Sequence, residues 1–102
     1  MAIYVTLSTL TETGMKTIRE YPARVKEVNK ELEKMGVKVL HQYALLGTHD
    51  FINVLEASDN ETVHRIVSGL VSRGTHYSMT MPAIVSDAFI ESLKQENSGG
   101  AK

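Results

Sequence analysis

Cysteine is absent from this chain of 102 residues. The protein therefore has no disulfide framework and no thiol nucleophile. Long apolar runs are absent as well, since no stretch approaches the roughly 18 residues that a membrane span requires. Residues 1–7 alternate between apolar and polar and lack a basic start, so we expect a strand there and not a signal peptide. These absences predict a cytoplasmic protein that does not bind a membrane.

An excess of charge of one sign is also missing. The chain has 11 basic and 12 acidic residues, for a net charge of −1. A nucleic-acid-binding protein usually shows a basic surplus on one face, so no nucleic-acid partner is predicted. The histidines lack the HxH, HxxxH and HExxH spacings, and we predict no metal site. No glycine-rich phosphate loop is present either, and no cofactor is predicted.

Periodicity along the chain predicts one domain over residues 1–96, followed by a flexible tail at 97–102. The expected elements are a strand at 2–8, a helical region at 11–35, strands at 37–46 and 51–57, a helix at 59–73, a strand at 75–82 and a last helix near 86–95. Thr11 is the expected N-cap of the first helix. Pro22 should break that helix, because proline lacks an amide proton and clashes with the preceding turn.

The stretch 47–59 contains a hairpin turn, an interior strand and the start of a helix. Gly47 supplies the bend, because glycine reaches positive φ without a steric penalty. Ser58 and Glu61 have the spacing of a capping box. The element order is βαββαβ, which is the ferredoxin-like arrangement. Right-handed crossovers predict that the first and third strands lie side by side in the centre and run parallel.

Several short motifs carry a resemblance to a known family. They are Leu46-Gly47-Thr48-His49-Asp50, Glu56-Ala57-Ser58-Asp59, Thr11 to Gly14 and Pro22 to Arg24. With these motifs the chain resembles the GYD domain family over roughly residues 3 to 88, and His49 stands at the position of the family's tyrosine. The resemblance implies an α+β, ferredoxin-like fold: a four-stranded antiparallel sheet with helices on one face and a C-terminal helix, pairing as a dimeric α/β barrel.

Alternation sorts the strand side chains into two sets. We expect the helices to cover the aliphatic set, which is Ile3, Val5, Leu7, Ile52, Val54, Met79 and Met81. The uncovered face would then show Tyr4, Thr6, Ser8, Val39, His41, Tyr43, Phe51, Asn53, Leu55, Ser78 and Thr80. The centre of that second set is too apolar to remain in water. A homodimer or higher homo-oligomer that packs sheet against sheet would bury it.

His41, Tyr43 and Asn53 form the constellation with the most chemical capacity. A histidine can transfer a proton near neutral pH, and tyrosine and asparagine can orient a carbonyl or a phenol. With Phe51, and with His49 and Tyr4 at the rim, they are the predicted ligand-binding residues: His41, Tyr43, Phe51, Asn53, His49 and Tyr4. The same residues could instead form a hydrogen-bonded network that fixes the register of a dimer.

Arg24 and Glu56 are expected to form an ion pair, because neither side chain should be buried alone. A structural pair that ties the broken helix to the central strand is one interpretation, and a clamp on a substrate is the other. Asp50 is expected to act as an acceptor for backbone groups at the turn.

Three functions are compatible with these residues. The first is a small homo-oligomeric cytoplasmic protein that binds a small, partly apolar molecule, or acts as an accessory or regulatory protein. The second is a cofactor-independent enzyme, isomerase-like or monooxygenase-like, with histidine as the acid–base group and tyrosine and asparagine holding an oxyanion. The third is a structural assembly protein with no ligand.

Overall fold

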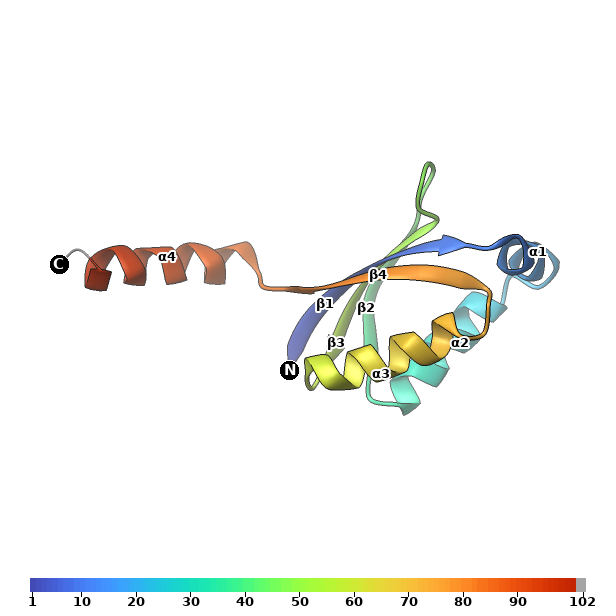
Figure 1. The fold of residues 1–102 in the computed structure, drawn as a ribbon, viewed down its shortest axis with the longest axis horizontal. Helices are drawn as coiled ribbons and strands as arrows, with labels where there is room; N and C mark the ends of the chain where they lie inside the picture. The colour runs from blue at the N-terminus through green and yellow to red at the C-terminus, as the bar shows by residue number, and fades with distance from the viewer. Residues whose placement is uncertain (101–102) are drawn as a thin grey trace.

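The structure is a computed structural model that describes residues 1–100. Eight elements follow one another: β1 (Ala2–Leu10), α1 (Glu12–Glu20), α2 (Arg24–Lys34), β2 (Lys38–Ala44), β3 (Phe51–Ala57), α3 (Asn60–Val71), β4 (His76–Ala83) and α4 (Ser86–Gly100). The four strands form one sheet in the order β2-β3-β1-β4. This arrangement confirms the α+β, ferredoxin-like fold (Figure 1).

All neighbouring strands of the sheet pair antiparallel. The expectation that β1 and β3 run parallel is therefore wrong. The helical crossover that follows β1 leads to β2, and the hairpin then returns β3 into the space between them. A strand that enters through a hairpin runs opposite to the strand before it. β3 is consequently antiparallel to both of its neighbours.

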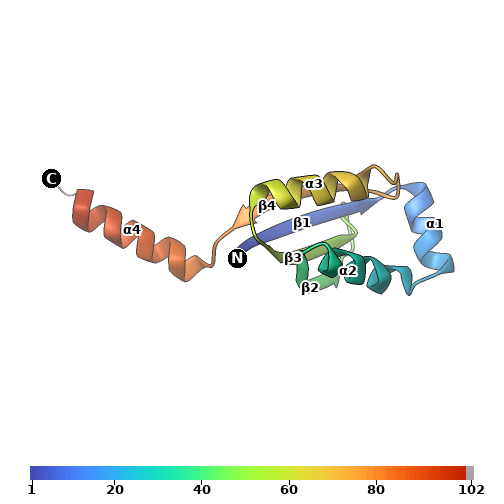
Figure 2. The same cartoon turned by 90° about the horizontal axis from the view of Figure 1, so that it is seen from below.

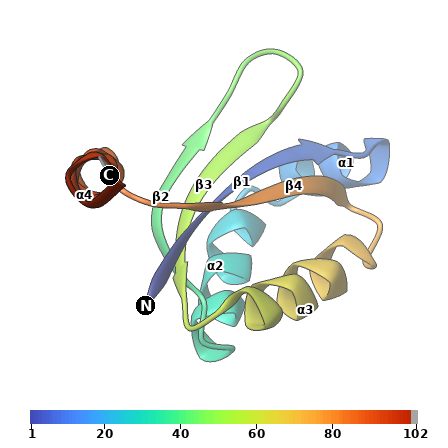
Figure 3. The same cartoon turned by 60° about the vertical axis from the view of Figure 1, so that its left-hand side comes forward.

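The helices α2 and α3 lie on the same side of the sheet (Figures 2 and 3). The side that they cover is the one expected to be open: Tyr4 is 2% exposed, Thr6 4% and Leu55 3%. Tyr4 and Leu55 share a core with Leu32 of α2, with Val63, Ile66 and Leu70 of α3, and with Val37 and Ala57. The predicted assignment of the two faces is thus inverted. Polar side chains are tolerated under the helices because they find partners there; the Tyr4 hydroxyl donates to Asn60 Oδ1 at 2.6 Å.

A bulge in β2 changes which of its side chains share a face. Val39 pairs with Leu55, but His41 pairs with Val54, so Leu40 is an extra residue between them. The expectation that His41 and Tyr43 share a face with Phe51 and Asn53 is wrong for this reason. After the bulge Gln42 lies opposite Asn53, and Tyr43 lies opposite Ile52 on the other face.

Local signals in the sequence locate the helix ends well. The predicted break at Pro22 is confirmed, since α1 ends at Glu20 and α2 begins at Arg24. The Thr11 cap is confirmed too, because its hydroxyl accepts from the Gly14 amide at 3.1 Å. The cap of α3 is one residue later than expected: Asp59, and not Ser58, accepts from the Thr62 amide at 2.8 Å.

The helix α4 extends away from the sheet and the other helices (Figure 1). It makes the molecule elongated, with extents of 60 × 30 × 19 Å. Phe89, Ile90 and Leu93 on this helix are exposed. The predicted tail at 97–102 has a helical backbone as far as Gly100, and residues 101–102 lie outside the described part of the chain.

Candidate functional site

A cavity of about 170 Å³ lies between the sheet and the helices. Its floor comes from the covered face of the sheet, where Thr6, Ser8, Asn53 and Ser78 present small or polar side chains. Its walls are aliphatic side chains of the helices, among them Val28, Val67 and Leu70. A site of this composition, with a few polar groups in apolar walls, is typical of small-molecule pockets.

A chain of side-chain amides crosses the floor of the cavity. Asn29 on α2 donates to Gln42 Oε1 at 2.9 Å, and Gln42 donates to Asn53 Oδ1 at 2.8 Å. Asn53 in turn donates to Thr6 Oγ1 at 2.9 Å. Four elements are connected in this way, because the residues come from α2, β2, β3 and β1. These bonds satisfy polar groups that would each cost about 1–3 kcal/mol if buried without a partner.

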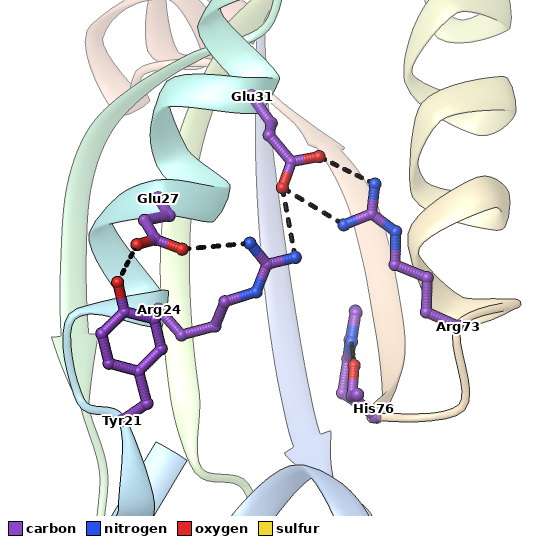
Figure 4. Close-up of polar contacts among 7 residues, drawn as sticks. Tyr21, Arg24, Glu27, Glu31, Arg73 and His76 are labelled. Atoms are coloured by element: carbon purple, nitrogen blue, oxygen red, sulfur yellow. Dashed lines mark hydrogen bonds and ion pairs between the residues drawn. The ribbon is translucent and has the colours of Figure 1, made fainter. Parts of the chain in front are cut away.

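An arginine–glutamate–arginine cluster lies between α2 and the end of α3. Arg24 approaches Glu31 at 3.2 Å, and Arg73 approaches the same carboxylate at 2.8 Å. Figure 4 shows the two guanidinium groups reaching Glu31 from different elements. The hydrogen bonds from Arg73 lower the pKa of Glu31, and the nearby Arg24 acts in the same direction. Glu31 is consequently ionised at neutral pH and holds the two arginines together.

A second carboxylate completes the cluster on the side of α1. Glu27 receives a hydrogen bond from the Tyr21 hydroxyl and lies 3.3 Å from Arg24 (Figure 4). The hydrogen bond from Tyr21 lowers the pKa of Glu27, and Arg24 adds to that effect. These polar contacts hold Tyr21, in the segment between α1 and α2, against α2.

His76 also lines the cavity, next to Arg73. Its Nδ1 lies 3.4 Å from the Thr75 hydroxyl. Burial lowers the pKa of His76 below its usual value, and the positive charge of Arg73 lowers it further. The imidazole is therefore neutral near pH 7 and can either donate or accept a hydrogen bond.

The structure divides the predicted ligand-binding residues between the two faces of the sheet. Asn53 and Phe51 line the cavity, and Tyr4 lies on the same covered face. His41 and Tyr43 are exposed on the opposite face, where Tyr43 is 61% exposed. They do not lie near Asn53, because the extra residue Leu40 places the side chains of His41 and Tyr43 on the other face of the sheet.

His49 and Asp50 lie in the β2–β3 connection and make contacts with β1. His49 Nδ1 is 3.2 Å from Thr9 Oγ1. Asp50 accepts from the Leu10 amide at 2.7 Å, which confirms its predicted role as a backbone acceptor. These contacts tie the hairpin to β1 and leave both residues outside the cavity lining.

The predicted ion pair between Arg24 and Glu56 is not formed. Arg24 pairs instead with Glu27 and Glu31, both on its own helix. In the part of the chain that the structure describes, Glu56 has no ion-pair partner; it lies opposite Ile3, on the face that the helices do not cover. The sheet separates the two side chains, so the inverted faces account for this error as well.

Sequence reasoning missed Arg73, His76, Gln42 and Asn29 as residues of the site. One signal for these residues was available in the sequence. Small polar side chains recur on one face of the strands, at Thr6, Ser8, Asn53 and Ser78, and such residues are unusual in strands that pack under helices. Once that face is placed under the helices, polar residues of α2 and of the α3–β4 connection become its neighbours.

Residues 1–100 contain neither a metal-binding cluster nor a helix that could span a membrane. No group of three or more histidine, aspartate or glutamate side chains there is arranged to hold a metal ion. None of the helices described is both long enough and apolar enough to cross a membrane.

Comparison with known proteins agrees with this architecture. The family profile described as the GYD domain matches residues 4–93. The chain belongs to the GYD domain family. This GYD protein is also 48% identical, over 95 residues, to the "Glutamine synthetase and cystathionine beta-lyase binding protein" of Thermus thermophilus, covering 92% of the chain and 100% of the relative. No solved structure matches the chain.

Proposed function

We propose that this GYD protein is a small accessory protein that binds other proteins, with glutamine synthetase and cystathionine beta-lyase as its candidate partners. The observation that carries the proposal is the 48% identity to a relative named for binding those two enzymes, along that relative's whole length. Identity at this level over a complete chain supports a common mode of action. A cytoplasmic location is part of the same proposal.

The proposal includes a homodimer that packs two open sheet faces together. The face that the helices leave uncovered carries a continuous aliphatic surface: Ile3, Val5, Leu7, Ile52, Val54, Met79 and Met81. An apolar surface of that kind is typical of an interface. A second copy of the chain presents the same surface, and an isologous contact between the two would cover both.

We propose that the helix α4 is the segment of this chain that contacts the enzyme partner. Phe89, Ile90 and Leu93 lie at helical spacing on it, and Phe89 is 52% exposed. An amphipathic helix with such a stripe commonly docks into an apolar groove of another protein. Because α4 extends beyond the sheet, it is accessible to a second protein (Figure 1).

The experiment measures binding of the purified chain to purified glutamine synthetase and cystathionine beta-lyase of Thermus thermophilus by isothermal titration calorimetry. The Thermus relative serves as the positive control. We expect saturable binding to at least one enzyme, and a loss of about tenfold or more in affinity when Phe89→Ser and Leu93→Ser are combined. Glu91→Gln and Lys94→Gln on the same helix are the matched controls, and they should bind as the wild type does.

Two results would contradict the proposal. If the relative binds and this chain binds neither enzyme, the accessory function is wrong. If the chain binds but the α4 double variant binds equally well, the assignment of α4 is wrong while the accessory function stands.

A further inference from the structure

A groove runs between α3 and the edge strand β4, beside the cavity described above (Figure 2). Its volume of about 650 Å³ is within the usual range of small-molecule sites. One wall is a ridge of Val63, Val67 and Val71, which recur every four residues along one side of α3. At 1.5 Å per residue this aliphatic ridge is about 12 Å long. The groove is therefore suited to the extended apolar part of a ligand.

The floor of the groove contains hydroxyl groups whose hydrogen-bonding capacity is largely unused. Thr80 lies directly opposite Thr6 on the covered face of the sheet, and its Oγ1 is buried without a hydrogen bond within residues 1–100. Ser78 has a distant partner in the Ser8 hydroxyl, at 3.4 Å. Buried polar groups are normally paired, so the Thr80 hydroxyl indicates a partner that this chain does not supply. A turn about χ1 exchanges this hydroxyl with the threonine methyl group, which allows the oxygen to reach the groove.

One end of the groove offers a hydrogen-bond donor and an acceptor side by side. The Tyr4 hydroxyl donates to Asn60 Oδ1 at 2.6 Å, so the Tyr4 oxygen can still accept, and the Asn60 amide nitrogen supplies donors. Thr80 lies near this end, because Tyr4 pairs with Pro82, two residues further along β4. Apart from the exposed His64, the described lining has no side chain that can carry a charge opposite to that of an ionised ligand. A neutral polar group fits this end better than an ion does.

We propose that the groove between α3 and β4 binds a small neutral molecule with an extended aliphatic body and an uncharged polar group, of the amide or alcohol class. The body lies against the valine ridge of α3. The polar group hydrogen-bonds with Tyr4, Asn60 and the Thr80 hydroxyl. Among residues 1–100, none from α4 lines the groove, so the inference stands whether or not the chain binds an enzyme.

Hexanamide is the probe, and hexanoate and hexylammonium are its charged counterparts of the same chain length. The ¹⁵N-labelled chain alone is titrated, and the groove is followed through the side-chain amide of Asn60 and the backbone amides of Val71 and Thr80. The side-chain amides of Asn29 and Asn53 report on the neighbouring cavity. We expect saturable shifts of the groove signals with hexanamide. Both ions should bind about tenfold more weakly or less, because burying a charge without a partner is costly.

Two variants test the polar and the apolar part of the site. Thr80→Val removes the hydroxyl and nearly keeps the shape of the side chain; hexanamide should bind about fivefold more weakly, while the urea midpoint of the chain rises. Ser68→Leu, at an exposed position of the lining, fills part of the groove and should also weaken binding. Arg65→Leu adds the same side chain to α3 outside the lining, and this matched control should bind as the wild type does.

Four outcomes would overturn the inference. The first is the absence of any shift of the groove signals at millimolar hexanamide. The second is a set of shifts confined to Asn29 and Asn53, which would place the probe in the cavity. The third is equal affinity for hexanamide and its charged counterparts. The fourth is wild-type affinity in both folded variants, Thr80→Val and Ser68→Leu.

Discussion

Gly14 in α1 lies directly against the backbone of Thr75, which precedes β4. A Cβ atom added to Gly14 would be 1.9 Å from the Thr75 carbonyl oxygen and 2.8 Å from its carbonyl carbon. The neighbouring Thr11 reinforces the contact, because its amide donates to the Thr75 carbonyl at 3.0 Å and its hydroxyl to the Gly74 carbonyl at 2.8 Å. The start of α1 is therefore fixed to the α3–β4 connection, next to the cavity.

Gly14→Ala should destabilise the protein by about 2–4 kcal/mol, because the methyl group meets backbone atoms that cannot move aside as a side chain can. Chemical denaturation followed by circular dichroism measures the change. Gly69→Ala is the matched control, since Gly69 is also helical but has nothing within 4 Å of the added atom. It should stabilise the protein by about 0.5–1 kcal/mol, through helix propensity alone. Equal effects of the two changes would contradict the packing argument.

Asp50→Ala should cost about 1–3 kcal/mol of unfolding free energy, because the Leu10 amide loses its acceptor in a partly buried place. Asp50→Asn keeps an acceptor oxygen and should cost less. Glu91→Ala, an exposed carboxylate on α4, is the control and should lie within about 0.5 kcal/mol of wild type. Urea denaturation of the three variants provides the comparison. A loss for Asp50→Asn as large as that for Asp50→Ala would mean that the charge, and not the acceptor, matters.

His76 should make stability depend on pH in the weakly acidic range. Its pKa in the folded state is lowered from the ordinary value of 6.5, so between the two values the unfolded chain binds more protons than the folded one. Stability is then full above pH 6.5 and falls as the pH decreases from there through the lower folded value. Thermal melts of wild type and His76→Gln across this range should diverge as the pH falls, with the variant losing less. His64→Gln, on the exposed surface of α3, should follow the wild type. Parallel curves for wild type and His76→Gln would show that burial of this imidazole has no energetic effect.

Val54→Asp should prevent self-association, because Val54 lies in the middle of the open face and a charge there would be buried without a partner. Light scattering at micromolar concentration should give a dimer for the wild type and the mass of one chain, 11.3 kDa, for the variant. Ser68→Asp on the exposed surface of α3 should leave the dimer intact. Phe51 is unsuitable for this test, since it faces the helices and its replacement would disturb the fold. A wild-type protein that scatters as a single chain would refute the proposed dimer.

The local structure of this protein could be predicted from sequence because its causes are local. The break at Pro22, the Thr11 cap and the limits of β3 follow from a missing amide proton, a hydroxyl acceptor and two-residue alternation. The acceptor role of Asp50 follows in the same way from its place in a turn. The family resemblance added the overall fold.

Only the tertiary structure decided which face of the sheet the helices cover, and with it the site. Alternation shows that Tyr4, Thr6 and Ser8 share a face, but both faces of this sheet are apolar enough to be covered, so the pattern alone cannot distinguish them. The bulge at Leu40 then separates His41 and Tyr43 from Asn53, and a single extra residue in an alternating strand leaves no clear mark in the sequence. Arg73 is brought to Glu31 of α2 by the packing of α2 and α3 on that face, at a separation of 42 residues along the chain that no local pattern encodes.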